Sequence, residues 1–388
     1  MNAMPDDTPP IRTLEDLHQH LHAAVQLELA VIPPYLCALY TLLPGSNNES
    51  SLIIRSVVVE EMLHMVLASN VLNAVGGTPR FANEADAPRY PAYLPDGERR
   101  FQVHLERFSR DALDTFLKIE EPSLPHTPPE ADARLLAGAQ REPTPLKLLQ
   151  WHYATVGDFY QAIIEGLEWL TAEMGEKALF RGDPARQVTS AYYYAGGGEP
   201  IVVHDLATAR AALDEIVEQG EGEIHSIYDD DGDLAHFFRF MEIRHDQRYL
   251  PQALRQVNAA GMAKSGHPPE WPLPTGAPLG VEWDAVYPML RNPRTDDYPE
   301  GSAVRAASDA FNALWSRLLH ELERGLGGEP PLLLDAVGTM FELKYSALEL
   351  LRNPLPDHPG VHAGPAFEYV PALAGASGAS AIAAHARG

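Results

Sequence analysis

A carboxylate and an imidazole, Glu61 and His64, stand three residues apart inside a run from Val57 to Val71 that is otherwise almost wholly apolar. On a helix, residues at i and i+3 share one face at about 5 to 6 Å, so both side chains can reach one ion. The neighbours of Glu61 at helical spacing are Ile54, Val57, Val58, Met65 and Ala68. An unpaired carboxylate is costly in such surroundings, and a bound metal would remove that cost. Carboxylate-bridged metal sites in four-helix bundles take Glu-x-x-His from each of two helices and a single Glu from each of the others.

Glu28 is a second carboxylate that we expect in the core. Its neighbours at spacings of three, four and seven residues are Leu21, Ala24, Val25, Val31, Ile32 and Tyr35. A buried Glu can also pair with an arginine or accept a hydrogen bond from a tyrosine, so Glu28 alone does not establish a metal site. Together with the Glu61–His64 pair, it favours one.

A bundle site of this kind needs a second imidazole and two further carboxylates. His236 is the best candidate because apolar and aromatic residues flank it, and His225 is the alternative. The carboxylates that remain open are Glu221, Glu218 and Asp233 for the pair with the second imidazole, and Glu165 and Glu168 for the third helix.

Composition restricts the kind of metal and the kind of partner. The chain of 388 residues has 54 acidic and 29 basic residues, and its charge of −25 repels nucleic acids and anionic membrane surfaces. The single cysteine, Cys37, excludes an internal disulfide framework and disfavours thiolate sites. Carboxylates and imidazoles suit iron or manganese. Because Met1 to Thr13 lacks the pattern of a signal peptide and no run of 18 apolar residues occurs, we expect a soluble cytoplasmic protein.

The hydrophobic periodicity predicts an all-α, mainly helical protein with little strand. Thr13 and Asp16 form a variant of the capping box at the start of the first helix, which Pro33-Pro34 should interrupt. Helices are predicted over about 13–43, 50–75, 109–121, 146–174, 205–217, around 234–241, 302–325 and 331–352. The expected domains are a metal-binding bundle over 12–250, a Pro/Gly-rich connector over 251–300, a helical hairpin over 301–355 and a disordered tail over 372–388. A proline-rich lid is expected at 122–130.

Several stretches occur in order between about residues 12 and 246. They are LELAVIPPYLCALY around Glu28, EEMLHMVLASNVLNAVGG around Glu61 and His64, FSRDALDTFLKIEEP at 108–122, DFYQAIIEGL around Glu165, LFRGDPARQVT at 179–189, IVEQGEG ending at Gly222 and LAHFFRFMEI around His236. In these stretches the chain resembles the ferritin-like family that includes the iminophenyl-pyruvate dimer synthase domain of bisindole biosynthesis enzymes.

The resemblance implies a ferritin-like four-helix bundle with irregular insertions and a C-terminal helical hairpin. The implied ligands of a di-iron centre are Glu28, Glu61, His64, Glu165, Glu221 and His236. The resemblance thus favours Glu165 over Glu168, and Glu221 with His236 over His225. A paired carboxylate–imidazole site with open coordination positions in a dry pocket can activate dioxygen or peroxide, so we expect an oxidoreductase that oxidises or couples a small organic molecule. A non-catalytic iron-binding protein is the alternative, and the apolar helical surface is compatible with a homodimer.

Overall fold

A computed structural model of the protein describes residues 11–95, 100–123, 130–131, 151–194, 196–221, 227–229, 232–250 and 271–371. Most of these residues form helices, so the all-α prediction is confirmed. The one sheet among them is a two-stranded antiparallel ladder of β1 (Glu130–Ala131) and β2 (Trp151–His152). The predicted tail at 372–388 lies outside the described residues, as do 124–129 of the lid and 251–270 of the connector.

Two long neighbouring helices, α1 (Leu14–Thr41) and α2 (Asn48–Ala74), form the centre of the fold. The predicted capping box is present, since the Thr13 side chain accepts a hydrogen bond from Asp16 N at 3.1 Å and the Asp16 carboxylate accepts one from Thr13 N at 3.0 Å. α2 ends just before Gly76, whose φ of 85° is a common way to stop a helix. α1 is also long and apolar enough to cross a membrane, but 83% of its most apolar window is buried inside the protein, as in a core helix.

α1 continues through Pro33 and Pro34, so the predicted interruption is wrong. Proline has no N–H to bond the carbonyl four residues earlier, which for Pro34 is that of Ala30. The Tyr90 hydroxyl donates a hydrogen bond to this carbonyl at 2.7 Å and replaces the missing helical donor. Glu28 therefore lies on an unbroken helix.

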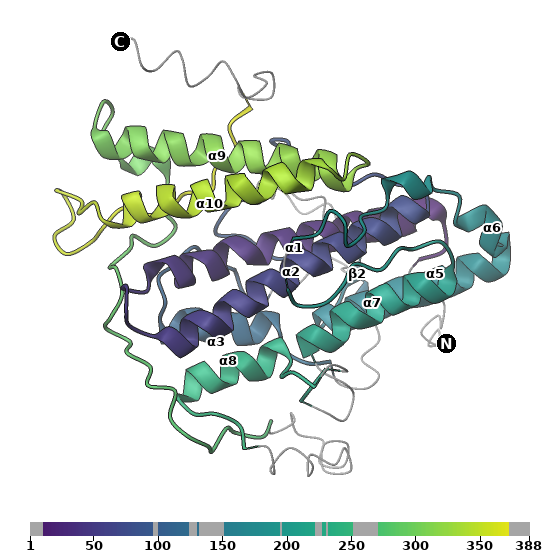
Figure 1. Ribbon diagram of the computed structural model, residues 1–388, viewed down its shortest axis with the longest axis horizontal. Coiled ribbons are helices and arrows are strands. Elements are labelled where there is room, and N and C mark those ends of the chain that lie inside the picture. The colour runs from purple at the N-terminus through teal and green to yellow at the C-terminus, as the bar shows by residue number, and fades with distance from the viewer. Residues whose placement is uncertain are drawn as a thin grey trace, which may run out of the picture.

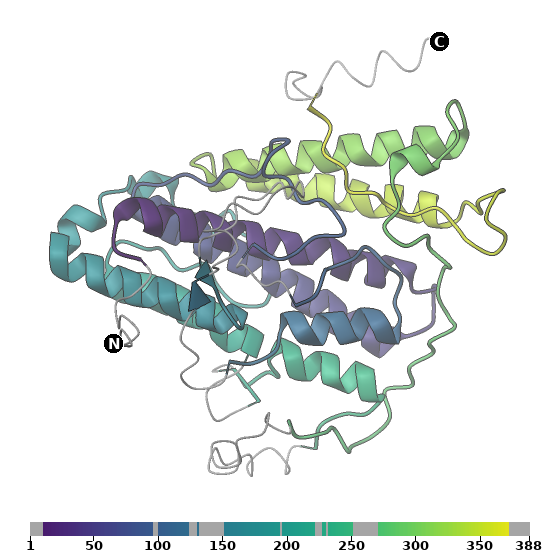
Figure 2. The same ribbon diagram turned by 180° about the vertical axis from the view of Figure 1, so that it is seen from behind.

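The other two sides of the bundle are each built from two shorter helices. On one side are α3 (Arg110–Ile119) and α5 (Val156–Met174), and on the other are α7 (Leu206–Glu221) and α8 (His236–His245). α3 packs on α8 at one end of the α1–α2 pair, and α5 packs on α7 at the other end (Figures 1 and 2). Both interrupted sides therefore break near the middle of the bundle.

Two of the predicted helix boundaries are wrong on these sides. α5 begins at Val156, because 151–152 form β2 and the Thr155 hydroxyl caps the helix by accepting from Asp158 N at 3.1 Å. α7 runs past Val217 to Glu221, with Gly220 buried in its last turn. Tertiary packing thus overrides the low helix propensity of glycine.

The predicted C-terminal helical pair is α9 (Ala303–Leu326) and α10 (Leu332–Leu351), which lie side by side over α1 and α2 (Figure 1). Phe311 and Trp315 of α9 belong to the same hydrophobic core as Leu21 of α1 and Leu72 of α2. The shared core means that the pair stabilises the bundle from one side. The shorter helical segments are α6 (Glu176–Leu179), η1 (Pro184–Arg186) and η3 (Thr295–Asp297).

Candidate metal centre

Five buried side chains converge in the middle of the bundle as two overlapping groups of three. Glu28, Glu61 and His64 form one group, and Glu61, Glu120 and His236 form the other. In each group the three ligand-type atoms lie within 4.8 Å of one another. All five residues are at most 7% exposed. Glu61 belongs to both groups and is the carboxylate that they share.

The two halves of this cluster come from different kinds of backbone. Glu28 lies within α1, and Glu61 and His64 lie within α2, both of which are unbroken. Glu120 directly follows α3, and His236 is the first residue of α8. The cluster therefore lies at the level where the two interrupted sides of the bundle break.

A cavity of about 30 Å³ lies beside the four residues Glu28, Glu61, His64 and Glu120. Its remaining lining residues are Leu27, Val31, Ile119, Val156, Ile216 and Gly220. A space of this size holds roughly one or two water-sized species. The apolar walls come from the ends of the broken helices as well as from α1.

Both imidazoles turn Nδ1 toward the carboxylates. His64 Nδ1 lies 3.5 Å from Glu28 Oε2 and 3.5 Å from Glu61 Oε2. His236 Nδ1 lies 3.0 Å from Glu61 Oε1 and 3.6 Å from Glu120 Oε2. The two rings are stacked, with centroids 5.4 Å apart. Each triad thus presents one nitrogen and two carboxylate oxygens to a common point.

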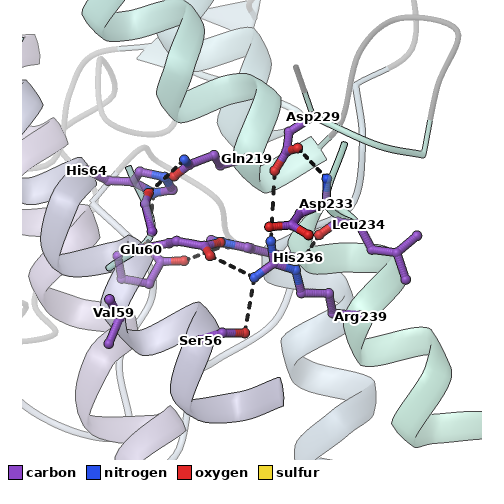
Figure 3. A network of polar contacts seen from close by, with 12 residues as sticks. Ser56, Val59, Glu60, His64, Gln219, Asp229, Asp233, Leu234, His236 and Arg239 are labelled. Atoms are coloured by element: carbon purple, nitrogen blue, oxygen red, sulfur yellow. Dashed lines mark hydrogen bonds and ion pairs between the residues drawn. The ribbon is translucent and has the colours of Figure 1, made fainter. Parts of the chain in front are cut away.

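The other ring nitrogen of each histidine is held from outside the cluster. His64 Nε2 lies 2.9 Å from Gln219 Oε1, and the Gln219 amide nitrogen donates to Gly197 O and to Glu215 Oε1 at 2.9 and 2.7 Å. These two acceptors fix the orientation of the amide, so Gln219 Oε1 must accept a hydrogen bond from the N–H of His64 Nε2. His236 Nε2 lies 2.8 Å from Glu60 Oε2, which is also an acceptor (Figure 3). In each neutral imidazole, Nδ1 is therefore the atom with the lone pair.

The terminal carboxylates are positioned by tyrosines. Tyr160 donates a hydrogen bond to Glu28 Oε1, and Tyr35 donates one to Glu120 Oε1. In both cases Oε2 remains the oxygen that faces the histidine. The two halves of the cluster therefore repeat one arrangement, in which a tyrosine holds a carboxylate and an outer acceptor holds an imidazole.

The donor set fits a cation at the centre. His236 Nδ1 is completely buried and has no hydrogen-bond partner among the residues that the structure describes. Three carboxylates and two imidazole nitrogens directed at one small space repel one another unless protons or metal ions lie between them. The outer hydrogen bonds to Nε2 are those that commonly orient metal-binding histidines. Iron and manganese match this set of oxygen and imidazole donors.

The pKa values of Glu28, His64 and Glu61 indicate that the cluster holds protons when no metal is bound. Burial raises the pKa of Glu28 to about 8, against the hydrogen bond from His64, and the charge of Glu61 adds to the rise. Burial disfavours the charged form of His64, but hydrogen bonds to Glu28 and Glu61 outweigh it and raise its pKa to about 10. Burial also opposes ionisation of Glu61, yet its close contacts with the His236 and His64 imidazoles lower its pKa. Protons therefore occupy this cluster near neutral pH, and a metal must displace them.

Four of the six predicted ligands, Glu28, Glu61, His64 and His236, are brought together. The side chain of Glu221 lies outside the described residues. Glu165 is exposed on α5 and accepts a hydrogen bond from Gln161 at 3.1 Å, so the structure does not place it in the cluster.

The alternative, Glu168, is also exposed and pairs with Arg210. Both residues lie outside the apolar stripe of α5, which faces the core through Tyr160, Ile163 and Leu167. The structure therefore places neither Glu165 nor Glu168 in the cluster.

Glu120 is the carboxylate that the sequence prediction missed. It follows a short helix and precedes Glu121-Pro122, so it looked like part of the loop. A signal was present, because Phe116 and Leu117 stand four and three residues before it, the same apolar spacing that identified Glu28. Glu60, which holds His236 from outside, was missed beside Glu61.

Replacing Glu120 with alanine is expected to reduce the bound metal from two ions per chain to one, because one triad loses a ligand. Glu165→Ala is the matched control and should retain both ions, since this side chain is exposed on α5. Metal content after equilibrium dialysis measures the difference. Loss of an ion in Glu165→Ala, with two retained in Glu120→Ala, would restore the original assignment.

Comparisons with known proteins agree with the helical fold. The chain is 24% identical to dichlorochromopyrrolate synthase from Lentzea aerocolonigenes over an alignment 422 positions long, which covers 92% of the chain and 36% of that enzyme. The chain thus spans about a third of the length of this relative.

The crystal structure of a ferritin-like protein from Caulobacter vibrioides shares the fold, with a TM-score of 0.56 and 23% identity over 93% of this chain and 100% of that one. The family model described as Ferritin-like matches residues 21–245, which is more than half of the chain. By this match, and with a helical bundle around a buried carboxylate–histidine cluster, the protein belongs to the ferritin-like family.

Proposed function

We propose that the protein is a non-haem di-iron oxidoreductase that uses dioxygen or peroxide to oxidise or couple a small organic molecule. The observation that carries the proposal is the double use of Glu61, which completes two carboxylate–imidazole triads around one buried space. When bound, two iron ions would supply the electrons and the open coordination positions for reaction with dioxygen or peroxide. Manganese is the alternative metal.

The proposed ligands follow from the two triads. Glu28 and His64 would hold one ion, Glu120 and His236 would hold the other, and Glu61 would serve both because it belongs to both triads. We retain Glu221 as a further proposed ligand, because its neighbour Gly220 lines the cavity. Tyr160 and Tyr35 hold the terminal carboxylates in place through their hydroxyl groups.

The cavity restricts what can reach the cluster. Its volume of about 30 Å³ suits an ion, a water or a diatomic molecule. Pockets that enclose organic ligands measure roughly 300 to 1,000 Å³. An organic substrate would therefore be oxidised from the mouth of the cavity, while the apolar walls of Leu27, Val31 and Ile216 keep bulk water from the cluster.

The relative from Lentzea aerocolonigenes supports an enzyme that acts on an organic molecule, because it is named as a synthase. Its chain is much longer than this one, so the substrate of this protein is proposed only as a class. A non-catalytic iron-binding protein is the second candidate function. The observation in its favour is the small cavity, which accommodates ions without an organic substrate.

One experiment distinguishes these functions. Metal-free protein is loaded with Fe(II) under anaerobic conditions and mixed with dioxygen or peroxide in the presence of an imine or amino-acid derivative as the organic reductant. We expect two irons per chain and repeated turnover, with loss of the organic reductant coupled to consumption of the oxidant.

Protein loaded with Zn(II), which has no redox chemistry, is the control and should show no turnover. Accumulation of ferric mineral without organic turnover would favour the iron-binding alternative. Both functions would be contradicted if the protein bound neither iron nor manganese and if neither metal changed its melting temperature.

A further inference from the structure

The two histidines of the cluster are held by chemically different partners. His236 Nε2 donates to a carboxylate, that of Glu60, at 2.8 Å. His64 Nε2 donates to a neutral amide, that of Gln219, at 2.9 Å. Both outer partners are buried, at 6% and 4% exposure, so neither interaction is much weakened by solvent. The two halves of the cluster, otherwise alike, differ at this point.

Glu60 belongs to a buried ionic group on the His236 side (Figure 3). Arg239 Nη1 lies 2.8 Å from Glu60 Oε1 and donates to Ser56 Oγ at 3.1 Å. Arg239 Nη2 also lies 3.8 Å from Asp229 Oδ2, so one guanidinium is shared between two carboxylates. Arg239 fixes Glu60 in place, but it neutralises only part of the negative charge beside His236.

On the His64 side the nearest outer carboxylate, that of Glu215, does not touch the imidazole but is hydrogen-bonded to Gln219. The Gln219 amide donates to Glu215 at 2.7 Å, and the Glu215 side chain is partly exposed. The charge that acts on His64 is therefore more distant and better screened by water. A hydrogen bond from an imidazole to a carboxylate is stronger than one to an amide, and it makes the imidazole the more basic metal ligand.

We propose that Glu60 and Gln219 are positioning residues that make the two metal positions unequal, so that the position at Glu120 and His236 takes the first ion. This inference rests on the proposed function, because it requires two ions in the cluster. Outer-shell partners of metal-binding histidines typically change affinity by about 10- to 100-fold. A difference of that order between the two binding steps is expected.

The test is a titration of the metal-free, full-length protein with Co(II), followed by visible absorption and by isothermal titration calorimetry. The wild type should bind in two steps that differ at least about tenfold in affinity. Glu60→Gln should weaken the tighter step and leave the weaker one unchanged. Gln219→Ala should weaken only the weaker step, and this opposite pattern is one that general structural damage does not produce.

A double variant tests the opposite change on the His64 side. Gln219→Glu combined with Glu215→Gln exchanges the amide and the carboxylate, places the charge next to His64 and should tighten the weaker step. Glu168→Gln is the matched control for Glu60→Gln, because Glu168 is exposed on α5, and it should alter neither step.

Two equal steps in the wild type, or equal effects of Glu60→Gln on both steps, would overturn this inference alone. Failure to bind any ion would instead overturn the proposed function, and the inference with it. Should Glu60→Gln fail to fold, the Gln219 variants still decide the result.

Discussion

Replacing Glu61 with alanine is expected to remove both metal ions, because its carboxylate completes both triads. His64→Ala should remove one ion, since His64 belongs to a single triad. Metal content after dialysis measures these losses. We expect two ions for the wild type loaded in parallel, one for His64→Ala and none for Glu61→Ala. Each bound ion should also add about 2.7 kcal/mol of stability at a free metal concentration 100 times its own Kd, a gain that Glu61→Ala should lose.

The secondary structure should survive this substitution. Alanine is the best helix former and Glu61 lies within α2, so far-ultraviolet circular dichroism is expected to stay at the wild-type value. Glu165→Ala makes the same change at an exposed helical position and should leave the metal content unaltered. Two ions retained in Glu61→Ala would mean that the protein binds metal elsewhere.

The stabilisation that a metal gives should increase as the pH is raised from about 6 to about 8. In the metal-free fold the pKa of Glu28 is raised from 4.5 to about 8, so the folded protein keeps a proton that the unfolded chain loses above 4.5. The metal-free protein therefore loses stability as the pH rises through this interval.

His64 acts in the same direction. Its pKa is raised from 6.5 to about 10, so its stabilising contribution is complete below pH 6.5 and is lost as the pH rises toward 10. The lowered pKa of Glu61 matters only below its ordinary value of 4.5, outside the interval tested. A bound metal replaces these protons, so the loaded protein escapes the loss and the difference between loaded and metal-free forms widens with pH.

Melting temperatures of the metal-free and Mn(II)-loaded protein at about pH 6, 7 and 8 measure this widening. The comparison removes the effect of the overall charge of −25, which acts on both forms. Glu28→Gln removes one of the two groups and should make the metal-free protein less sensitive to pH. A difference between the forms that is constant or shrinks as the pH rises would contradict the protonated cluster.

Local sequence patterns correctly predicted the features that depend on residues close together in the chain. The cap at Thr13, the stop at Gly76 and the Glu61–His64 pair depend on spacing within one helix, and each is found as predicted. The continuity of α1 through Pro34 depends on a hydroxyl at Tyr90, 60 residues beyond the carbonyl that it satisfies. No local pattern reveals such a partner.

The predicted ligand residues differ from the cluster in the structure at two points, an exposed helix face and a helix end. Glu165 lies outside the apolar stripe of its helix already in the sequence, and only the resemblance favoured it; in the structure it is exposed on α5. Gln219 and Glu60 were missed for a related reason, since each is identified by the imidazole that it meets from another helix. Residues that act by orienting a ligand carry no spacing signature of their own.

Because two sides of the bundle are broken, one half of the centre stands on continuous helices and the other half stands on helix termini. Glu28, Glu61 and His64 stand on continuous hydrogen-bonded helices, where moving one side chain means moving a whole helix. Glu120 and His236 stand at helix termini, where the backbone ladder is incomplete and small rotations are less costly. A change in the distance across the centre would therefore cost less on the side of Glu120 and His236 than on the side of the two continuous helices.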